Sequence, residues 1–205
     1  MTPAPNPRLS LYLIRHGETE WSLSGQHTGR TDVPLTARGE DQARELTPWL
    51  RCIRFAHVLT SPRQRARRTC VLAGLGAQAE IEQDLQEWDY GEYEGKLSPD
   101  IRKQRPGWDV FQDGCPGGEM PEQIADRADR LIARLCVMDG EIALFSHGEF
   151  GLVLAARWIG LPVLNAQNFS LGTASLSILS YNPAHPEIRV IALWNACPAM
   201  LAGGG

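Results

Sequence analysis

Short apolar runs that end abruptly in polar residues recur along the chain. Residues 9–14 form a nearly continuous apolar run that stops at Arg15-His16-Gly17. Residues 141–145 form a similar run that stops at Ser146-His147-Gly148, and residues 57–60 form a third, shorter one. Such runs are typical of buried parallel strands. In open α/β sheets the carboxyl ends of these strands face the ligand.

Amphipathic segments lie between the predicted strands. The clearest helix is predicted over residues 121–138, where apolar residues recur at helical spacing with Asp and Arg residues between them. Its predicted core positions are Ile124, Ala128, Leu131, Ile132 and Leu135. Another helix is expected over residues 150–158, directly after a strand and its polar end. The order of strand, loop and helix therefore repeats.

Local signals predict where two further helices begin and end. Thr36 is a candidate N-cap for a helix over residues 40–50, which Pro48 should kink or end. Ser61-Pro62 predicts the start of another helix, with Ser as N-cap and Pro in the first helical position. That helix should stop near Gly74.

These elements predict a three-layer α/β/α fold with a mainly parallel central sheet, built as a single domain over residues 1–205. Residues 79–82 are an expected edge strand, and residues 174–181 and 188–194 an expected closing pair of strands. Residues 83–118, rich in Gly, Pro and aromatic residues around one short helix, are expected to form a lid over the ligand site. The ends of the chain, residues 1–7 and 201–205, are expected to be disordered.

Composition places the chain among ordinary globular proteins. Its 205 residues are 43% hydrophobic and 21% charged, and the net charge is −4. This balance argues against nucleic acid or a membrane surface as partner. Five scattered cysteines without metal-binding spacing, and the absence of a signal-like start or a long apolar run, favour a cytoplasmic protein with reduced thiols.

Arginine greatly outnumbers lysine, 18 to 2. An Arg-rich genome would explain this bias. Guanidinium groups that bind phosphate through two parallel hydrogen bonds would explain it as well. The position of each arginine must decide between the two explanations.

Two predicted strands each deliver a histidine followed by glycine, at His16-Gly17 and His147-Gly148. Glycine lets an anion approach the backbone because it has no Cβ. A neutral imidazole can attack phosphorus if its other nitrogen is held and the charge of the anion is neutralised nearby. Arg15 and Arg65 are candidates for that neutralisation.

Further motifs follow in a fixed order over most of the chain. They are residues 13–21 (Leu-Ile-Arg-His-Gly-Glu-Thr-Glu-Trp), Thr28-Gly29, Asp32, Pro34-Leu35-Thr36, Ser61-Pro62, Arg65-Ala66, Glu87, Tyr90-Gly91, Glu94-Gly95, Gly118-Glu119 and Ser146-His147-Gly148. In this order and spacing the chain resembles the histidine phosphatase superfamily, which includes cofactor-dependent phosphoglycerate mutases and many phosphatases.

The resemblance implies a role for each matching residue. His16 would be the nucleophile, Glu87 the proton donor, and Arg15, Arg65 and His147 would bind the transferred phosphoryl group. Three cationic or donor side chains would offset the charge on the phosphoryl oxygens, so neither a metal nor a cofactor is implied. Glu87 would first give a proton to the leaving oxygen and then accept one from water.

Other residues are expected around this group. The residues expected to contact the phosphate or substrate in addition are Ser22, Thr28, Gly29, Tyr90 and Gly148. Glu18 and Glu119 are expected to order loops rather than react, and His27 is a weaker candidate for substrate contact. Trp88 and Trp108 would serve a pocket wall or ordinary loop packing equally well.

Departures from the mutase pattern favour a phosphatase. Ser22 and Trp88 stand where the mutases have Asn and Arg, and residues 97–116 lack the longer arginine-bearing segment of the mutases. The chain is most similar to the sedoheptulose-1,7-bisphosphatase branch and related bacterial acid phosphatases, which implies a small phosphorylated metabolite, a sugar phosphate or bisphosphate, as substrate. Residues 63–68 are a candidate site for a second phosphate. A cofactor-dependent mutase and a catalytically silent phosphometabolite-binding protein are the alternatives, and a homodimer is possible by analogy.

Overall fold

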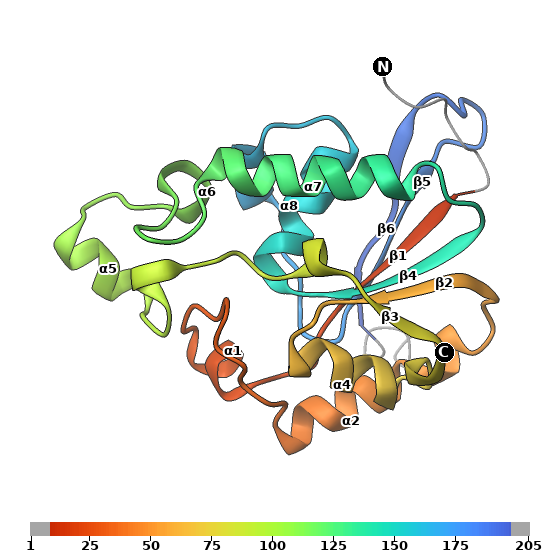
Figure 1. Ribbon diagram of the computed structural model, residues 1–205, viewed down its shortest axis with the longest axis horizontal. Coiled ribbons are helices and arrows are strands. Elements are labelled where there is room, and N and C mark those ends of the chain that lie inside the picture. The colour runs from red at the N-terminus through yellow and green to blue at the C-terminus, as the bar shows by residue number, and fades with distance from the viewer. Residues whose placement is uncertain (1–8, 198–205) are drawn as a thin grey trace, which may run out of the picture.

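A six-stranded sheet forms the centre of the molecule (Figure 1). The computed structural model describes residues 9–197, so the disorder expected for residues 1–7 and 201–205 lies outside the described residues. The strands are β1 (Ser10–Arg15), β2 (Phe55–Thr60), β3 (Ala79–Ile81), β4 (Glu141–Ser146), β5 (Leu176–Tyr181) and β6 (Arg189–Ala196). Their order across the sheet is β3-β2-β4-β1-β5-β6.

The sheet is mainly parallel, as the sequence predicts. β1 and β2 both pair with β4 in parallel, and β3 extends the parallel part at one edge. β5 runs antiparallel to β1, and β6 antiparallel to β5, so these strands form the expected closing pair. Nearly every residue of β4 is buried because helices cover both faces of the sheet.

Helices cover both faces of the sheet and give the predicted three layers (Figure 1). On one face lie α7 (Pro121–Leu135) and α8 (Gly148–Trp158), which pack against each other. On the other lie α2 (Ala37–Glu45), α3 (Thr47–Leu50) and α4 (Gln64–Leu72). The five predicted core positions of α7 are all buried, which confirms the helical spacing read from the sequence.

Helix boundaries follow capping chemistry. α2 begins directly after Thr36, whose hydroxyl accepts a hydrogen bond from the Gly39 N–H at 3.0 Å. It ends at Glu45, and α3 carries Pro48 in its first turn, so the predicted break occurs. α2 thus starts at Ala37, directly after its N-cap and three residues before the predicted start at residue 40.

The predicted start of α4 at Ser61-Pro62 is wrong. The chain stays extended through Ser61, whose N–H donates to the Phe145 carbonyl at 2.9 Å and continues the pairing of β2 with β4. The helix begins only at Gln64, whose N–H donates to the Asp32 carboxylate at 2.8 Å. The acceptor for the first helical N–H therefore comes from a residue distant in the sequence, whereas the Ser61 hydroxyl accepts from the Arg63 N–H, ahead of the helix, at 3.3 Å.

Residues 83–118 run beside the carboxyl end of the sheet (Figure 1). They contain 3₁₀ turns at Gln83–Leu85 and Gly91–Tyr93, the expected short helix α5 (Ser98–Gln104) and an unpredicted helix α6 (Val110–Asp113). The remaining short elements are α1 (Glu20–Ser24) and 3₁₀ turns at Gly76–Gln78 and Val163–Asn168. Trp88 and Trp108 are fully buried and belong to the hydrophobic core, so packing explains these two aromatic residues.

Candidate active site

The two histidines predicted at strand ends lie side by side. β1 and β4 are neighbours whose last residues, Arg15 and Ser146, are paired in register. His16 continues this pairing, because its N–H donates to the Ser146 carbonyl at 3.0 Å. The rings of His16 and His147 consequently lie with their centroids 5.2 Å apart at the carboxyl end of the sheet.

The His16 ring is held in one neutral form. Its Nδ1 lies 2.7 Å from the Gly17 carbonyl oxygen, which can only accept, so Nδ1 carries the proton. Nε2 is then the unprotonated nitrogen. Burial, together with the positive charges of Arg65 and Arg15, holds the pKa of His16 well below its ordinary value. The ring therefore has the protonation state of a nucleophile at neutral pH.

Arg15 lies against the backbone of Gly148. A Cβ at Gly148 would be 3.3 Å from the guanidinium carbon of Arg15, so glycine makes room for this side chain. The sequence predicted that Gly148 contacts phosphate; in the structure it contacts Arg15 and does not line the cavity. One guanidinium nitrogen of Arg15 donates to the Leu171 carbonyl, whereas Nε is buried and has no hydrogen-bond partner. An anion bound beside it would supply the missing acceptor.

Arg65 is fully buried behind the cavity wall. Its terminal nitrogens donate to the carbonyls of Thr31, Thr28 and Gly29 at 2.9, 3.0 and 3.0 Å. Its Nε donates to Nδ1 of His147 at 3.2 Å. Arg65 thus ties α4 to the loop at residues 28–31 and to the second histidine.

His147 is held on both of its ring nitrogens. Nδ1 accepts from Arg65, so Nε2 carries the proton and donates to the Ser61 hydroxyl at 2.7 Å. Burial and the charge of Arg65 lower the pKa of His147 well below its ordinary value. The structure brings Arg65 and His147 next to His16, but neither is among the residues that line the cavity. Their direct contacts to a phosphoryl group remain predictions.

A cavity of about 220 Å³ opens beside His16. The residues that line it are Arg15, His16, Trp21, Ser22, Gly25, Gln26, His27, Thr28, Glu87, Tyr90, Ser98 and Glu149. Predicted site residues supply about half of this wall. The sequence indicated no substrate contact for Trp21, Gln26 or Ser98, because α1, the residues after it and the start of α5 meet only in the folded chain.

Polar groups predicted to meet the substrate are already bonded within the protein. The Ser22 hydroxyl donates to the Thr19 carbonyl at 2.9 Å. The Gly29 N–H donates to the Glu94 carboxylate at 2.8 Å, so this amide already has an acceptor and its contact to phosphate stays a prediction. Glu94 also accepts from the N–H groups of Arg30 and Thr31, which orders the loop. The Thr28 hydroxyl lines the cavity but donates to the Gln26 carbonyl at 3.0 Å.

Glu87, the predicted proton donor, lines the cavity although it is only 7% exposed. One carboxyl oxygen accepts from the N–H groups of Trp88 and Phe150 at 2.8 and 2.7 Å, and the other from that of Glu149 at 3.1 Å. Burial, aided by the charge of Glu149, raises the pKa of Glu87 to about 8 despite these donors. Glu87 therefore carries a proton at neutral pH, as a general acid requires.

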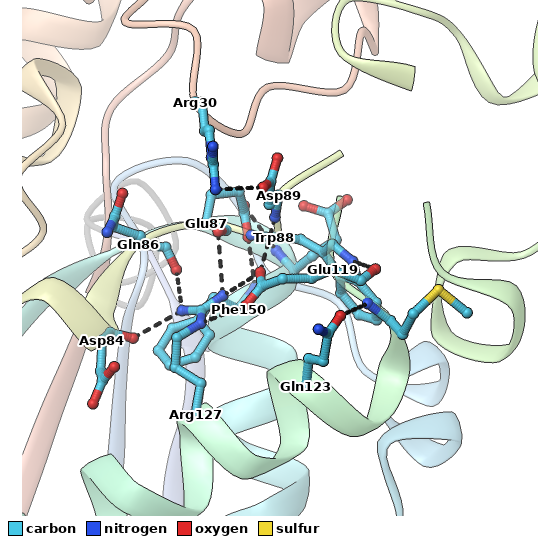
Figure 2. Close-up of polar contacts among 12 residues, drawn as sticks. Arg30, Asp84, Gln86, Glu87, Trp88, Asp89, Glu119, Gln123, Arg127 and Phe150 are labelled. Atoms are coloured by element: carbon cyan, nitrogen blue, oxygen red, sulfur yellow. Dashed lines mark hydrogen bonds and ion pairs between the residues drawn. The ribbon is translucent and has the colours of Figure 1, made fainter. Parts of the chain in front are cut away.

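Arg127 of α7 holds the segment that carries Glu87 (Figure 2). Its Nε and one terminal nitrogen donate to the two oxygens of Glu119 at 2.8 and 2.7 Å. The terminal nitrogens also donate to the carbonyls of Asp84, Gln86 and Glu87 at 2.9, 2.7 and 3.3 Å. The guanidinium stacks 4.3 Å from the centre of the Phe150 ring. All five N–H donors of Arg127 are thus used.

Glu119 orders this loop, which is the role that the sequence favours. One of its carboxylate oxygens accepts from the Asp89 N–H at 2.9 Å. The sequence prediction missed Arg127, which it placed among the polar positions of α7, although the residue is 8% exposed. The available signal was its spacing, since it lies three residues after Ile124 and four before Leu131 on the buried face.

Glu149 is the cavity residue that the sequence most clearly overlooked. It follows His147-Gly148 directly and lies in the first turn of α8, so its place after the second histidine was the available signal. His27 lines the cavity too, stacks on Tyr90 with a centroid distance of 4.5 Å, and bonds to the Ser98 hydroxyl at 3.0 Å.

The basic segment at residues 63–68 does not reach the cavity. Arg63 donates to the Gln86 side chain at 2.7 Å, and Arg68 pairs with Glu40 at 2.7 Å. Arg67 and Arg68 line a separate depression beside Pro34 and Leu35. A second phosphate held by these arginines would therefore lie outside the cavity beside His16.

Within residues 9–197, no helix combines the length and apolar character needed to cross a membrane. In the same described part of the chain, His, Cys, Asp and Glu side chains form no group of three suited to a metal ion.

Known proteins resemble this chain over most of its length. The model of the histidine phosphatase superfamily (branch 1) matches residues 11–193. An acid phosphatase of Mycobacterium tuberculosis is 40% identical over 198 residues, covering 95% of this chain and 97% of the relative. A sedoheptulose 1,7-bisphosphatase of Saccharomyces cerevisiae is 37% identical over 194 residues, covering 78% of this chain and 70% of the relative.

A more distant relative and a solved structure are similar to this chain as well. A probable phosphoglycerate mutase of Salmonella choleraesuis is 30% identical over 183 residues, covering 84% of this chain and 85% of the relative. A solved structure of an open reading frame product from Mycobacterium tuberculosis has a TM-score of 0.86 and 38% identity, covering 92% of this chain and 98% of that one. The chain therefore belongs to the histidine phosphatase superfamily and is a phosphatase.

Proposed function

We propose that the protein is a metal-independent phosphomonoesterase that acts through a phosphohistidine at His16 on a small sugar phosphate or bisphosphate. One observation carries the proposal: a neutral His16, with Nδ1 bonded to the Gly17 carbonyl, shares a cavity with a carboxyl group that is protonated at neutral pH. Nucleophile and general acid thus have the protonation states that the reaction needs, without a metal ion.

The reaction would proceed in two transfers. In the first, Nε2 of His16 forms a bond to phosphorus while the bond from phosphorus to the leaving oxygen breaks, and Glu87 gives its proton to that oxygen. In the second, water attacks phosphorus and passes a proton to the Glu87 carboxylate, and the N–P bond breaks to release phosphate. Glu87 ends protonated and His16 neutral, so the cycle closes.

Charge stabilisation would come from the groups that surround the nucleophile. The buried, unpartnered Nε of Arg15 offers a donor to a phosphoryl oxygen. Arg65 and His147 would join it if the bound phosphoryl group replaced part of their contacts with each other and with Ser61. Donors fixed before the substrate arrives lower the barrier because they need little rearrangement.

A polar, small cavity supports a small hydrophilic substrate. Ser22, Gln26, His27 and Ser98 contribute neutral hydrogen-bonding groups to its wall, which suit the hydroxyl groups of a sugar. The similarity to a sedoheptulose 1,7-bisphosphatase supports the same class of substrate.

The proposal is tested by phosphate release from a panel of sugar mono- and bisphosphates with EDTA present. The purified protein should release phosphate, and His16→Ala should abolish this. In parallel, interconversion of 2- and 3-phosphoglycerate should be absent with and without 2,3-bisphosphoglycerate. Isomer exchange would instead show a mutase, and binding without turnover would show a silent phosphometabolite-binding protein.

A further inference from the structure

The charges around the cavity are unevenly distributed. Of its lining residues in the described chain, Arg15 is the only one with a permanent positive charge, and Glu87 and Glu149 are its carboxyl groups. Burial lowers the pKa of His16 and His27, so both rings are neutral at pH 7. If Arg15 serves the transferred phosphoryl group, the rest of the wall offers no positive charge to a second anion.

Glu149 lines the cavity beside the proton donor Glu87. Its backbone N–H donates to the Glu87 carboxyl group at 3.1 Å, and its own carboxylate lines the same cavity. The leaving oxygen must come within hydrogen-bonding distance of Glu87 to receive a proton. The remainder of the leaving group therefore passes close to the Glu149 carboxylate.

Nearby arginines do not compensate for this carboxylate. Arg102 acts electrostatically on His27, but it does not line the cavity and its Nε donates to the Trp108 carbonyl at 2.9 Å. Arg63 and Arg68 bond to Gln86 and Glu40 outside the cavity. A carboxylate or second phosphate on the leaving group would therefore meet Glu149 without a cation to offset it.

We infer that Glu149 determines the substrate class of this site: its carboxylate accepts hydrogen bonds from neutral polyol leaving groups and repels leaving groups that carry a second negative charge. This inference rests on the proposed function and narrows it from sugar phosphates and bisphosphates to monophosphates of neutral polyols. Like charges brought together in a confined site oppose binding strongly, and such repulsion is a common source of specificity.

A matched pair of substrates isolates the effect. Glycerol 3-phosphate and 3-phosphoglycerate are similar in size. The first carries a neutral hydroxymethyl group where the second carries a carboxylate. For the unmodified protein, kcat/KM should favour glycerol 3-phosphate by about tenfold or more. Glu149→Gln, which keeps the shape and removes the charge, should reduce this preference by about tenfold.

A control variant separates local repulsion from total charge. Glu92 is exposed and does not line the cavity, so Glu92→Gln changes the net charge equally and should leave the preference unchanged. The inference is overturned if the unmodified protein prefers 3-phosphoglycerate. It is overturned as well if Glu149→Gln leaves the ratio unchanged, or if Glu92→Gln alters it equally.

Binding to an inactive variant gives a second measurement that does not depend on turnover. Titration calorimetry on His16→Ala should show tighter binding of glycerol 3-phosphate than of 3-phosphoglycerate, and His16→Ala/Glu149→Gln should lose this difference. If the unmodified protein hydrolyses neither these compounds nor any sugar phosphate of the panel, the proposed function fails and calorimetry still decides the role of Glu149. Equal affinities in the single variant would refute the inference by itself.

Discussion

Two residues in the cavity have opposite pKa shifts that leave both uncharged at neutral pH. Burial lowers the pKa of His16 and raises that of Glu87, because it disfavours the charged form of each. The imidazole is then free to attack and the carboxyl group is able to donate. Burial thus leaves His16 as a neutral nucleophile and Glu87 as a proton donor.

The pH dependence of the reaction should report the protonated form of Glu87. For an alkyl phosphate, kcat/KM should fall as the pH rises through about 8, because the proton donor is lost above its pKa. Glu149→Gln removes a negative charge that raises this pKa, so the alkaline limb should move to lower pH. The profiles of the two proteins measure this shift, and an unmoved limb would contradict the coupling of these carboxyl groups.

Gly148 should be needed for the position of Arg15. A Cβ would stand 3.3 Å from the guanidinium carbon, so Gly148→Ala should displace the side chain. Relief of this contact needs a shift of only a few tenths of an ångström. Since a displacement of about 1 Å at a reacting centre can reduce the rate roughly 100-fold, we expect a smaller loss of about 3- to 10-fold in kcat/KM.

The matched control is Gly160→Ala, since a Cβ there meets nothing within 4 Å. That variant carries a backbone strain of its own, because Gly160 has a φ of +79°, so its unfolding temperature should fall. Its kcat/KM should stay unchanged. If Gly148→Ala kept full activity, the close approach of Arg15 to the backbone would have no catalytic importance.

At the scale of elements, α7 is joined to the segment at residues 84–89 through Arg127. Helix and segment are distant in sequence, and the guanidinium donates three hydrogen bonds to carbonyls of the segment (Figure 2). It donates two more to Glu119, which in turn accepts from the Asp89 N–H. The Phe150 ring beneath the guanidinium belongs to the residue whose N–H bonds to Glu87. Arg127 therefore positions the proton donor without touching the cavity.

Replacing Arg127 by Lys should harm acid catalysis more than binding. Lysine keeps the charge but lacks the planar five-donor fork, so Glu87 should lose its fixed position. Turnover of an alkyl phosphate, which needs a proton donor, should fall at least about tenfold more than turnover of p-nitrophenyl phosphate, whose leaving group needs little help. Rates should be compared below the unfolding temperature of the variant.

Arg130→Lys is the control on the same helix, because Arg130 is exposed and pairs with Asp84 at 3.2 Å only at the surface. This variant should retain the activity and the leaving-group dependence of the unmodified protein. Equal losses on both substrates in Arg127→Lys would mean that Arg127 serves stability alone.

The sequence predicted the presence of helices and strands better than the residues at which they begin and end. Continuous apolar runs indicated β1 and β4, and helical spacing indicated α7, because burial against a sheet imposes those patterns directly. The start of α4 could not be predicted, since its acceptor is Asp32 from another loop. The sequence assigned Arg127 to the polar face of α7 for a similar reason. Its hydrogen-bond partners, Glu119 and the carbonyls at residues 84–87, come from outside the helix.

At the scale of the whole molecule, parallel neighbouring strands explain why distant residues form one site. Residues 16 and 147 meet because β1 and β4 pair in register and end together. This convergence was predictable from two apolar runs with similar polar ends. The places of Gln26 and Ser98 in the wall were not predictable, since the segments that carry them are distant in sequence and meet at the bridge between Gln26 and Leu97.

The most direct measurement is detection of the phosphoryl group on the protein during turnover. We predict that rapid denaturation of the protein mixed with p-nitrophenyl phosphate, followed by peptide mass spectrometry at alkaline pH, finds one added phosphoryl group on the peptide that contains His16. His16→Ala should show neither the added group nor phosphate release. Phosphate release by the unmodified protein together with undiminished release by His16→Ala would contradict a phosphohistidine intermediate at His16.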